Sequence, residues 1–432
     1  MNATSRAERF TKSFNMPYQL GVYLAVNAVN DVGLVVDGGD CVMPKADFIA
    51  GNHDLRSTLL SPEGSHRIVC TMTGPLPQDA NHERKLSALL SEVASGGGFS
   101  AVLLTGLPFF KLAGADYEGI AAGVRKGAPV AEVPALSLEA DWLDGYDLAL
   151  ESLAGLLPAP RSGRKRAAKR PRVALAGYLF DRGERDHTAN IAELRRLLDL
   201  AGLELISVFP SGGSFRELAR SLEADLIVSL PYARRSAARL AARSGAALLE
   251  TGLPMGLKGT SSWLAAVRRA AGLGRKLPPP VLREECLAAR ELAPVLDVLA
   301  HRNAVFAGDP HLFAAFAGLA AEFRIRVPAV VLDSRARKKI PVKSGGTVLV
   351  CPDTAEAAGA VAALTGYGKP HLLVGNSFAA TEGFAPGLPF VELGFPSYGH
   401  HCVNDEPFLG FAGARTFAGR MVNALRGGNR RD

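Results

Sequence analysis

The sequence predicts an α/β protein built on three doubly wound parallel sheets. Short apolar runs of strand length alternate with longer segments of helical periodicity, this rhythm occurs three times along the 432 residues, and glycines stand at the strand ends. Open parallel sheets carry their ligands in loops beyond the carboxyl ends of the strands. We therefore expect functional residues in those loops and sites in the clefts between domains.

The first domain is predicted over residues 1–157. Its buried first strand, 33–37, ends at two glycines, and Asp40 and Cys41 follow at once. Because glycine has no side chain, a loop of this kind lets a thiol approach a ligand closely. A buried structural cysteine is an equally good interpretation of Cys41. The other predicted strands are 66–70 and 101–105, and the predicted helices are 18–30, 83–93 and 140–156.

More polar groups follow in the same domain. Cys70 ends the second predicted strand, where a further ligand can be placed, and His53, Asp54 and His66 lie nearby in the sequence. The Asn-His-Asp run at 52–54 is also ordinary turn chemistry, and for His53 alone we favour that interpretation.

Residues 158–172 carry seven basic residues, three prolines and no acidic residue. The net charge of +7, from 49 basic and 42 acidic residues, therefore resides in this segment, and the rest of the chain is neutral. A solvated interdomain linker is the favoured interpretation, and a tail that binds phosphate or a partner is the alternative. Because the charge is confined to this segment, we expect no nucleic-acid partner.

The second domain is predicted over 173–300 and the third over 301–432. In the second, Ser214 is predicted to cap a helix whose exposed amides could hold an anion. Neither a phosphate loop nor a dinucleotide fingerprint occurs in the chain, so it carries no sequence sign of ATP or dinucleotide binding. The predicted strands are 173–177, 203–209, 225–229, 247–250, 303–308, 329–332, 347–351, 369–375 and 391–393. The predicted helices are 191–201, 215–222, 233–244, 261–271, 282–301, 312–323 and one from Gly410 to Leu425.

The loop after the last predicted strand holds His400, His401 and Cys402 in succession. Imidazole and thiolate are both transition-metal ligands, so this composition alone is a metal-site hypothesis. The five cysteines are scattered and form no CxxC pair, which argues against a disulfide framework. No apolar run approaches the roughly 20 residues needed to span a bilayer. The first 15 residues lack the apolar core of a secretory signal. We expect a cytoplasmic protein with no membrane partner.

Taken in order, these segments resemble the nitrogenase component 1 superfamily over nearly the whole chain. The most specific match is Glu392-Leu-Gly-Phe-Pro-Ser-Tyr-Gly-His-His401 followed by Leu409-Gly-Phe-Ala-Gly-Ala414, which resembles the family's C-terminal element. In the first domain, Leu20-Gly-Val-Tyr23 and Val35-Val-Asp-Gly-Gly-Asp-Cys41 resemble a second family region.

The resemblance implies three Rossmann-like domains and an iron–sulfur cluster, most simply 4Fe-4S, at an interface between two subunits. It implies pairing with a paralogous component 1-like subunit or with a second copy of this chain. It also implies that a separate ATP-hydrolysing iron–sulfur reductase docks and delivers electrons. By this resemblance Cys41 is a cluster ligand, and Cys70, Asp40 and Cys402 are further candidates for cofactor binding, Cys70 also as a metal ligand.

The sequence departs from the family at its ligand positions. Of three first-domain cysteines that the family usually supplies, only Cys41 has a counterpart here. Tyr18 or its neighbours occupy the first position, and the segment 104–109 has no cysteine. The middle-domain cysteine of nitrogenase is also missing, since 229–233 reads Ser-Leu-Pro-Tyr-Ala. A partner chain, a symmetry mate or Asp40 would have to complete the four ligands that a cluster needs.

Two functions are compatible with this pattern. The first is the catalytic subunit of a nitrogenase-like reductase, with His400 and His401 as catalytic residues that donate protons, contact substrate or ligate metal. His400 lies near the position of a cofactor-ligating histidine in one nitrogenase subunit, whereas the His-His pair resembles the other subunit, where it is structural. The second is a non-catalytic scaffold, or a degenerate partner of a catalytic paralogue. A ligand-binding or sugar-nucleotide-transferring protein without iron is more remote.

Overall fold

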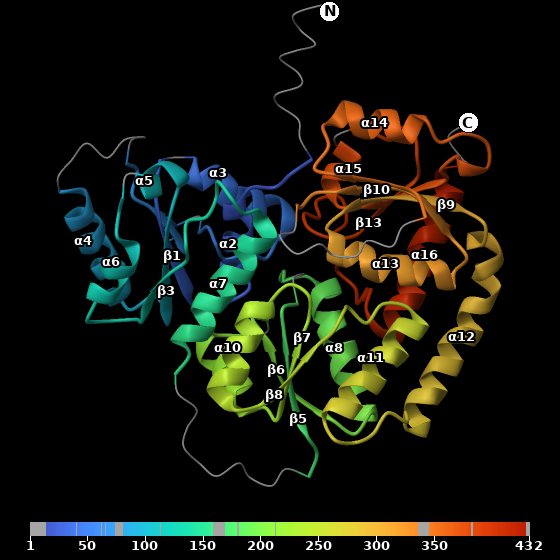
Figure 1. Cartoon of the computed structure of the whole chain (residues 1–432), viewed down its shortest axis with the longest axis horizontal. Coiled ribbons are helices and arrows are strands. Elements are labelled where there is room, and N and C mark those ends of the chain that lie inside the picture. Colours follow the sequence, from blue (N-terminus) through green and yellow to red (C-terminus); the bar gives the residue numbers. More distant parts are fainter. Residues whose placement is uncertain are drawn as a thin grey trace, which may run out of the picture. The chain divides into compact units, whose positions relative to one another are not determined.

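The fold is that of a computed structural model, which describes residues 14–39, 41–61, 63–64, 66–73, 81–112, 114–158, 169–178, 181–211, 213–335, 345–381 and 383–428. These residues contain three parallel sheets, as the sequence predicts (Figure 1). The chain forms two compact units. One comprises Pro17–Gly183 and Gly202–Thr251, and the other comprises Met1–Met16, Glu184–Ala201 and Gly252–Asp432. The predicted domain boundaries stay a prediction.

The first sheet has the strand order β2-β1-β3-β4, and all its pairs are parallel. Its central strands β1 and β3 are buried along their whole length, as expected of parallel strands covered on both faces. The order changes direction between β1 and β3, so the loops after these strands flank a topological switch point. The elements of this part are α2 (Tyr18–Asn27), β1 (Val32–Asp37), α3 (Val42–Asp47), the π-helical turn η1 (Phe48–His53), β2 (Ile68–Cys70), α4 (His82–Ser95), β3 (Ala101–Gly106), α5 (Pro108–Leu112), α6 (Tyr117–Gly123), β4 (Val130–Glu132) and α7 (Trp142–Leu156).

Helices α2 and α7 pack side by side (Figure 1). Glycines permit this close approach. A Cβ atom on Gly21 of α2 would stand 1.7 Å from the Trp142 carbonyl oxygen, and one on Gly145 of α7 would stand 2.2 Å from the Tyr18 carbonyl oxygen. The glycine in the Leu20–Tyr23 motif therefore has a packing role, which its position in the sequence alone did not indicate.

A buried arginine joins α2 to the first sheet. The Arg67 guanidinium donates hydrogen bonds to backbone carbonyls near the end of α2 and the start of β1, with Nη1 2.9 Å from Val26 O, 2.8 Å from Val29 O and 2.9 Å from Val32 O. Its Nε donates to Thr58 O at 3.0 Å. Burial lowers the pKa of Arg67 to about 10, so the group is still charged at neutral pH.

The second sheet has the order β6-β5-β7-β8 and is also parallel. The predicted anion site at Ser214 is filled by the chain itself, because the Phe215 N–H donates to the Asp31 carboxylate at 2.6 Å. The elements are β5 (Arg172–Ala176), β6 (Glu204–Phe209), α9 (Phe215–Leu218), the 3₁₀ turn η2 (Ala219–Glu223), β7 (Leu226–Ser229), α10 (Arg234–Ser244) and β8 (Ala247–Glu250). Most of the basic segment 158–172 lies outside the described residues.

The other unit holds the third sheet, of order β11-β10-β9-β12-β13 with parallel pairs, and the helix α8 (Arg185–Leu200). The C-terminal helix α16 (Gly410–Gly428) packs against α8 and α12. The further elements are α11 (Leu257–Ala270), α12 (Pro279–Leu299), β9 (Asn303–Gly308), α13 (Pro310–Glu322), β10 (Arg326–Leu332), β11 (Thr347–Val350), α14 (Thr354–Ala362), the 3₁₀ turn η3 (Gly366–Gly368), β12 (Leu372–Gly375), α15 (Ser377–Thr381) and β13 (Phe390–Glu392).

Candidate functional site

Cys41 and Cys70 both lie at the carboxyl edge of the first sheet. Cys41 follows β1 at the switch point, caps the short helix α3 and is exposed. Cys70 is the last residue of β2, where it pairs with Val36, and it is half-buried. The sequence therefore predicted correctly that both cysteines stand at strand ends. Asp40, the third candidate in this loop, lies outside the described residues.

The Cys70 thiol contacts the glycine loop that precedes Cys41. Its sulfur lies 3.1 Å from the Gly38 carbonyl oxygen and 3.0 Å from that of Gly39, so the thiol is placed to donate to a carbonyl. The Met72 N–H donates to the same sulfur at 3.4 Å. A ligating thiolate has no proton to give, so ligation by Cys70 would require its side chain to turn away from these carbonyls. Cys41 is the better placed of the two thiols.

A buried carboxylate, Asp37, ends β1 beside these cysteines. Its Oδ2 accepts a hydrogen bond from Tyr117 Oη at 2.9 Å and pairs with His82 Nε2 at 2.8 Å, while its Oδ1 accepts from Thr71 Oγ1 at 2.9 Å. Burial, and then the negative charge of Asp37, raise the pKa of Tyr117. Asp37 can thus orient His82 as a proton donor or acceptor. The sequence pattern did not mark Asp37 as a site residue, although an aspartate at a strand end before two glycines was a signal.

The iron–sulfur cluster implied by the sequence resemblance needs more ligands than this edge provides. In the described part of the chain, neither Cys41 nor Cys70 belongs to a group of three or more His, Cys, Asp or Glu side chains whose donor atoms lie within 4.8 Å of one another. A cluster of this kind is usually held by four thiolates. The described residues of this chain therefore do not fit a complete cluster site, and at most they supply part of one.

The loop that holds the adjacent histidines is built at the end of β13. Gly394, at φ +109°, turns the chain out of the strand in a conformation that favours glycine. The buried Glu392 then accepts hydrogen bonds from the backbone of Tyr398 at 2.8 Å and of Gly399 at 3.0 Å, and from Ser377 Oγ. The loop leading to His400 is therefore fixed by a charged side chain of its own strand.

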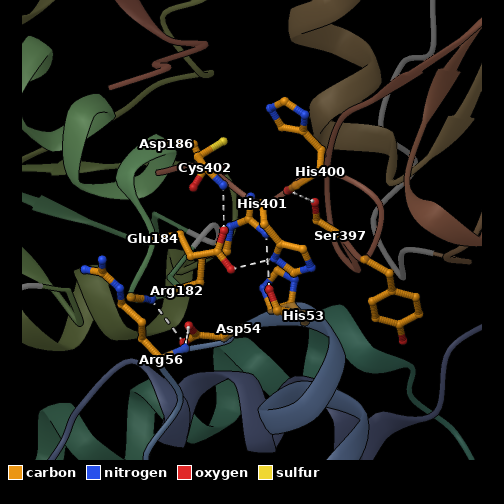
Figure 2. Close-up of polar contacts among 12 residues, drawn as sticks. His53, Asp54, Arg56, Arg182, Glu184, Asp186, Ser397, His400, His401 and Cys402 are labelled. Atoms are coloured by element: carbon orange, nitrogen blue, oxygen red, sulfur yellow. Dashed lines mark hydrogen bonds and ion pairs between the residues drawn. The ribbon is translucent and has the colours of Figure 1, made fainter. Parts of the chain in front are cut away.

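Glu184, the N-cap residue of α8, contacts His401 and Cys402, the two residues that follow His400. Its carboxylate pairs with His401 Nδ1 at 2.8 Å and accepts a hydrogen bond from the Cys402 N–H at 2.8 Å (Figure 2). Glu184 is buried, whereas the His401 ring is partly exposed. A carboxylate on one ring nitrogen fixes the orientation and the tautomer of a histidine. His401 is thus equipped to donate a proton through Nε2.

His400 belongs to a different set of contacts. Figure 2 shows its ring directed away from Glu184. One ring nitrogen, Nε2, pairs with Glu406 Oε2 at 3.0 Å, and the same oxygen accepts from Arg420 Nη2 at 2.7 Å. Burial raises the pKa of Glu406, but Arg420 and His400 outweigh it and hold that pKa below the usual value. Arg420 Nη2 also lies 3.5 Å from Cys402 Sγ.

Two more polar residues of α8 fix the Gly-rich end of the loop. The buried Asn190 Oδ1 accepts from the Phe408 N–H at 2.9 Å and the Leu409 N–H at 2.8 Å. Glu193 Oε1 accepts from the Ala412 N–H at 3.0 Å. Gly410 has φ +73°, and a Cβ there would stand 2.5 Å from Glu193 Cγ. The backbone of the C-terminal sequence motif is therefore held by polar side chains of α8, through hydrogen bonds to Asn190 and Glu193.

We expect Asn190→Ala to lower the free energy of unfolding by about 2–3 kcal/mol, because it removes an oxygen that accepts hydrogen bonds from two buried N–H groups. Denaturant unfolding measures the loss, and hydrogen exchange at the Phe408 and Leu409 amides reports it locally. Thr188→Ala, at an exposed position of the same helix, should stay within about 0.5 kcal/mol of the parent. Unchanged exchange at both amides in Asn190→Ala would contradict this role.

The structure thus brings His400 and Cys402 together with Glu406, which the sequence had not indicated. The ring of His401 contacts Glu184 and is not part of that group. Cys41 and Cys70 share one sheet edge. His53 is buried and is the last residue of the π-helical segment η1, and Asp54 accepts a hydrogen bond from the Arg56 N–H at 3.0 Å. The roles predicted for these site residues stay predictions.

The three parallel α/β sheets, with thiols and histidines in loops at their carboxyl edges, define a multi-domain doubly wound protein of the kind that builds cofactor sites at strand ends. Residues 81–426 match the family described as "Nitrogenase component 1 type Oxidoreductase", and the chain belongs to this family. The nitrogenase structure titled "Nitrogenase Cp1 at pH 6.5" has the same fold, with a TM-score of 0.78 at 15% identity, and the match covers 98% of this chain and 94% of that one. The predicted fold and family are therefore confirmed.

Three relatives match this chain over only part of their own length. The chain is 27% identical to one of the light-independent protochlorophyllide reductase subunits of Methylobacterium sp. (strain 4-46) over 72% of this chain, and spans 61% of that relative. It is 26% identical to the chlorophyllide reductase 52.5 kDa chain of Cereibacter sphaeroides over 93% of this chain and 76% of the relative. The nitrogenase molybdenum-iron protein beta chain of Frankia alni is 23% identical over 66% of this chain and 58% of its own length.

Among the described residues, no helix combines the length and the apolar character needed to cross a membrane.

Proposed function

We propose that the chain is one subunit of a nitrogenase-like oxidoreductase, which a separate ATP-dependent iron–sulfur reductase supplies with electrons for an unidentified substrate. The observation that carries the proposal is Cys41, an exposed thiol at the switch point of the first sheet in a chain of this family. The relatives named as reductase subunits support the reaction class. The missing phosphate loop agrees with ATP hydrolysis on another protein.

The proposed cluster site is shared between subunits. Cys41, with Cys70 if its side chain turns, supplies part of a ligand set, and a paralogous component 1-like subunit or a second copy supplies the rest. Such a cluster, of the 4Fe-4S type in the family pattern, would carry single electrons towards the substrate. An exposed cysteine suits this role, because a partner's thiolates can reach the same metal only at a surface. The cytoplasm is the proposed compartment, because thiols stay reduced there.

The two histidines receive different roles in this proposal. His401, whose ring is fixed by the buried Glu184 through Nδ1, is the better placed of the two to donate a proton, through Nε2. His400 pairs with Glu406 and has the Cys402 sulfur within 4.8 Å of a ring nitrogen, so it suits metal ligation better.

A non-catalytic scaffold, or a structural partner of a catalytic paralogue, is the second candidate. One observation favours it: the described residues around Cys41 and Cys70 form no group of three metal-competent side chains. A scaffold would hold a metallocofactor in transit and would turn over no substrate. Iron bound together with a partner, in the absence of any reductase activity, would support it over the catalytic role.

We expect Cys41→Ala to lose at least about nine tenths of the iron bound by the anaerobically purified complex, because a cluster rarely survives the loss of a thiolate. Iron and acid-labile sulfide analysis, with the visible spectrum, measures this. Cys286→Ala, at another exposed cysteine on α12, is the matched control and should keep its iron. Equal iron in the two variants would remove Cys41 from the site.

A further inference from the structure

A cluster of metal-competent side chains lies in the segment between β13 and α16, far in the sequence from Cys41. One ring nitrogen of His400, Sγ of Cys402 and a carboxylate oxygen of Glu406 all lie within 4.8 Å of one another. In the described part of the chain, no other group of three His, Cys, Asp or Glu side chains comes this close. Figure 2 shows the His400 ring and the Cys402 sulfur on the side of the loop that faces away from His401.

The three donor types point to one class of ion. A thiolate, an imidazole and a carboxylate together suit Zn²⁺, a borderline-soft ion that accepts sulfur, nitrogen and oxygen ligands at about 2.0–2.3 Å. Mg²⁺ and Ca²⁺ prefer oxygen ligands and would not select a cysteine and a histidine. Three protein ligands leave the fourth tetrahedral position open to water or a small ligand, as in catalytic rather than structural zinc sites.

The ligands are held in place by their neighbours. The Cys402 backbone is fixed on both sides, because its N–H donates to Glu184 Oε2 at 2.8 Å and its carbonyl accepts the Arg185 N–H at 3.1 Å. Cys402 is buried, while His400 and Glu406 are partly exposed and leave a route of entry. Preorganised ligands with supporting hydrogen bonds are typical of metal sites.

Arg420 competes with a metal ion for Glu406, because it already forms an ion pair with that carboxylate. It donates to Glu406 Oε2 through Nε at 3.0 Å and through Nη2 at 2.7 Å, and it lies 3.5 Å from Cys402 Sγ. A carboxylate has two oxygens, so Glu406 can keep Arg420 on one and ligate through the other.

We infer that His400, Cys402 and Glu406 form a three-ligand site for one divalent transition-metal ion of the zinc type. The inference does not depend on the proposed cluster site at Cys41, since no residue of the first sheet takes part. It assigns to His400 a role as ligand and to Arg420 a role in holding Glu406 and the Cys402 sulfur beside the ion.

Cobalt(II) added to the chelator-treated full-length protein without oxygen tests this directly. We expect one equivalent of Co²⁺ to give a thiolate-to-cobalt charge-transfer band and the intense visible bands of a four-coordinate ion. We expect Zn²⁺ to displace the cobalt, because it binds N/O/S sites more tightly. Cys402→Ser should abolish the charge-transfer band, and Glu406→Gln should weaken Co²⁺ binding at least about tenfold. Cys41→Ser and Cys286→Ser are the controls and should keep the band.

Failure of the inference has distinct signatures. A parent protein that shows no charge-transfer band with stoichiometric Co²⁺ would reduce the cluster to an ion pair of His400, Glu406 and Arg420. A band that persists in Cys402→Ser, or that disappears in one of the control variants, would place the ion at another cysteine. Should Cys402→Ser fail to fold, Glu406→Gln still decides, since an unchanged Co²⁺ affinity in that partly exposed variant contradicts the site.

Discussion

Gly21→Ala should destabilise the unit that contains the first two sheets by about 3 kcal/mol or more. The added Cβ would stand 1.7 Å from the Trp142 carbonyl oxygen and 2.7 Å from the Tyr146 backbone nitrogen. Backbone atoms of a helix cannot turn aside as a side chain can, so α2 and α7 must move apart. Such a shift costs more than the usual overpacking of a core, which is about 1–3 kcal/mol.

Fluorescence can isolate this unit. The chain has two tryptophans, and Trp142 lies in this unit whereas Trp263 lies in the other. In a Trp263→Phe background, denaturant unfolding followed by fluorescence therefore reports on the unit with the glycine. Gly123→Ala is the matched control, because it lies in helix α6 of the same unit with open space around it. Equal unfolding midpoints for Gly21→Ala and Gly123→Ala would contradict the close helix packing.

Arg67→Met should have an effect of similar size, about 3 kcal/mol or more. It removes the guanidinium that donates to Val26 O, Val29 O and Val32 O, and it leaves these buried carbonyls without this donor. Arg67→Lys should recover only part of the loss, since an ammonium group has three donors on a flexible stem and cannot reproduce the planar fork.

The same tryptophan background measures the Arg67 variants. Arg125→Met, at an exposed position of the same unit, provides the control and should stay within about 0.5 kcal/mol of the parent. If Arg67→Lys were as stable as the parent, the positive charge of Arg67 would account for its role. The planar geometry of its hydrogen bonds would then contribute nothing to stability.

Much of the fold follows from local sequence pattern. The buried parallel strands β1, β3 and β9 read as continuous apolar runs and were predicted within a residue or two. The segment between β1 and β2 was not, because α3 and the π-helical η1 have no clear periodicity and depend on tertiary contacts. The helix predicted over 18–30 ends earlier, at Asn27. There Arg67, which lies 40 residues further along the chain, donates hydrogen bonds to the carbonyls of Val26 and Asn27.

The candidate sites were predictable only in part, for the same reason. Cys41, Cys70, His400 and Cys402 are visible as metal-competent residues at strand ends or in a loop. Their partners come from distant segments: Glu184 reaches the loop across 218 residues of sequence. Glu406 was close enough in sequence to be considered with His400 and Cys402. Its importance appears only when the loop folds back, since an exposed glutamate six residues after a histidine is common.

We propose that this chain supplies part of a metal-cluster site that a second subunit completes. Anaerobic purification of the chain alone, and together with a paralogous component 1-like chain produced in the same cells, tests it through iron and sulfide analysis of both preparations. We predict about four irons and four sulfides per completed site in the pair, and a substoichiometric amount for the isolated chain if it stays a monomer. A full cluster in the monomer, or no iron in the pair and in a dimer of this chain, would rule out a cluster site shared between subunits.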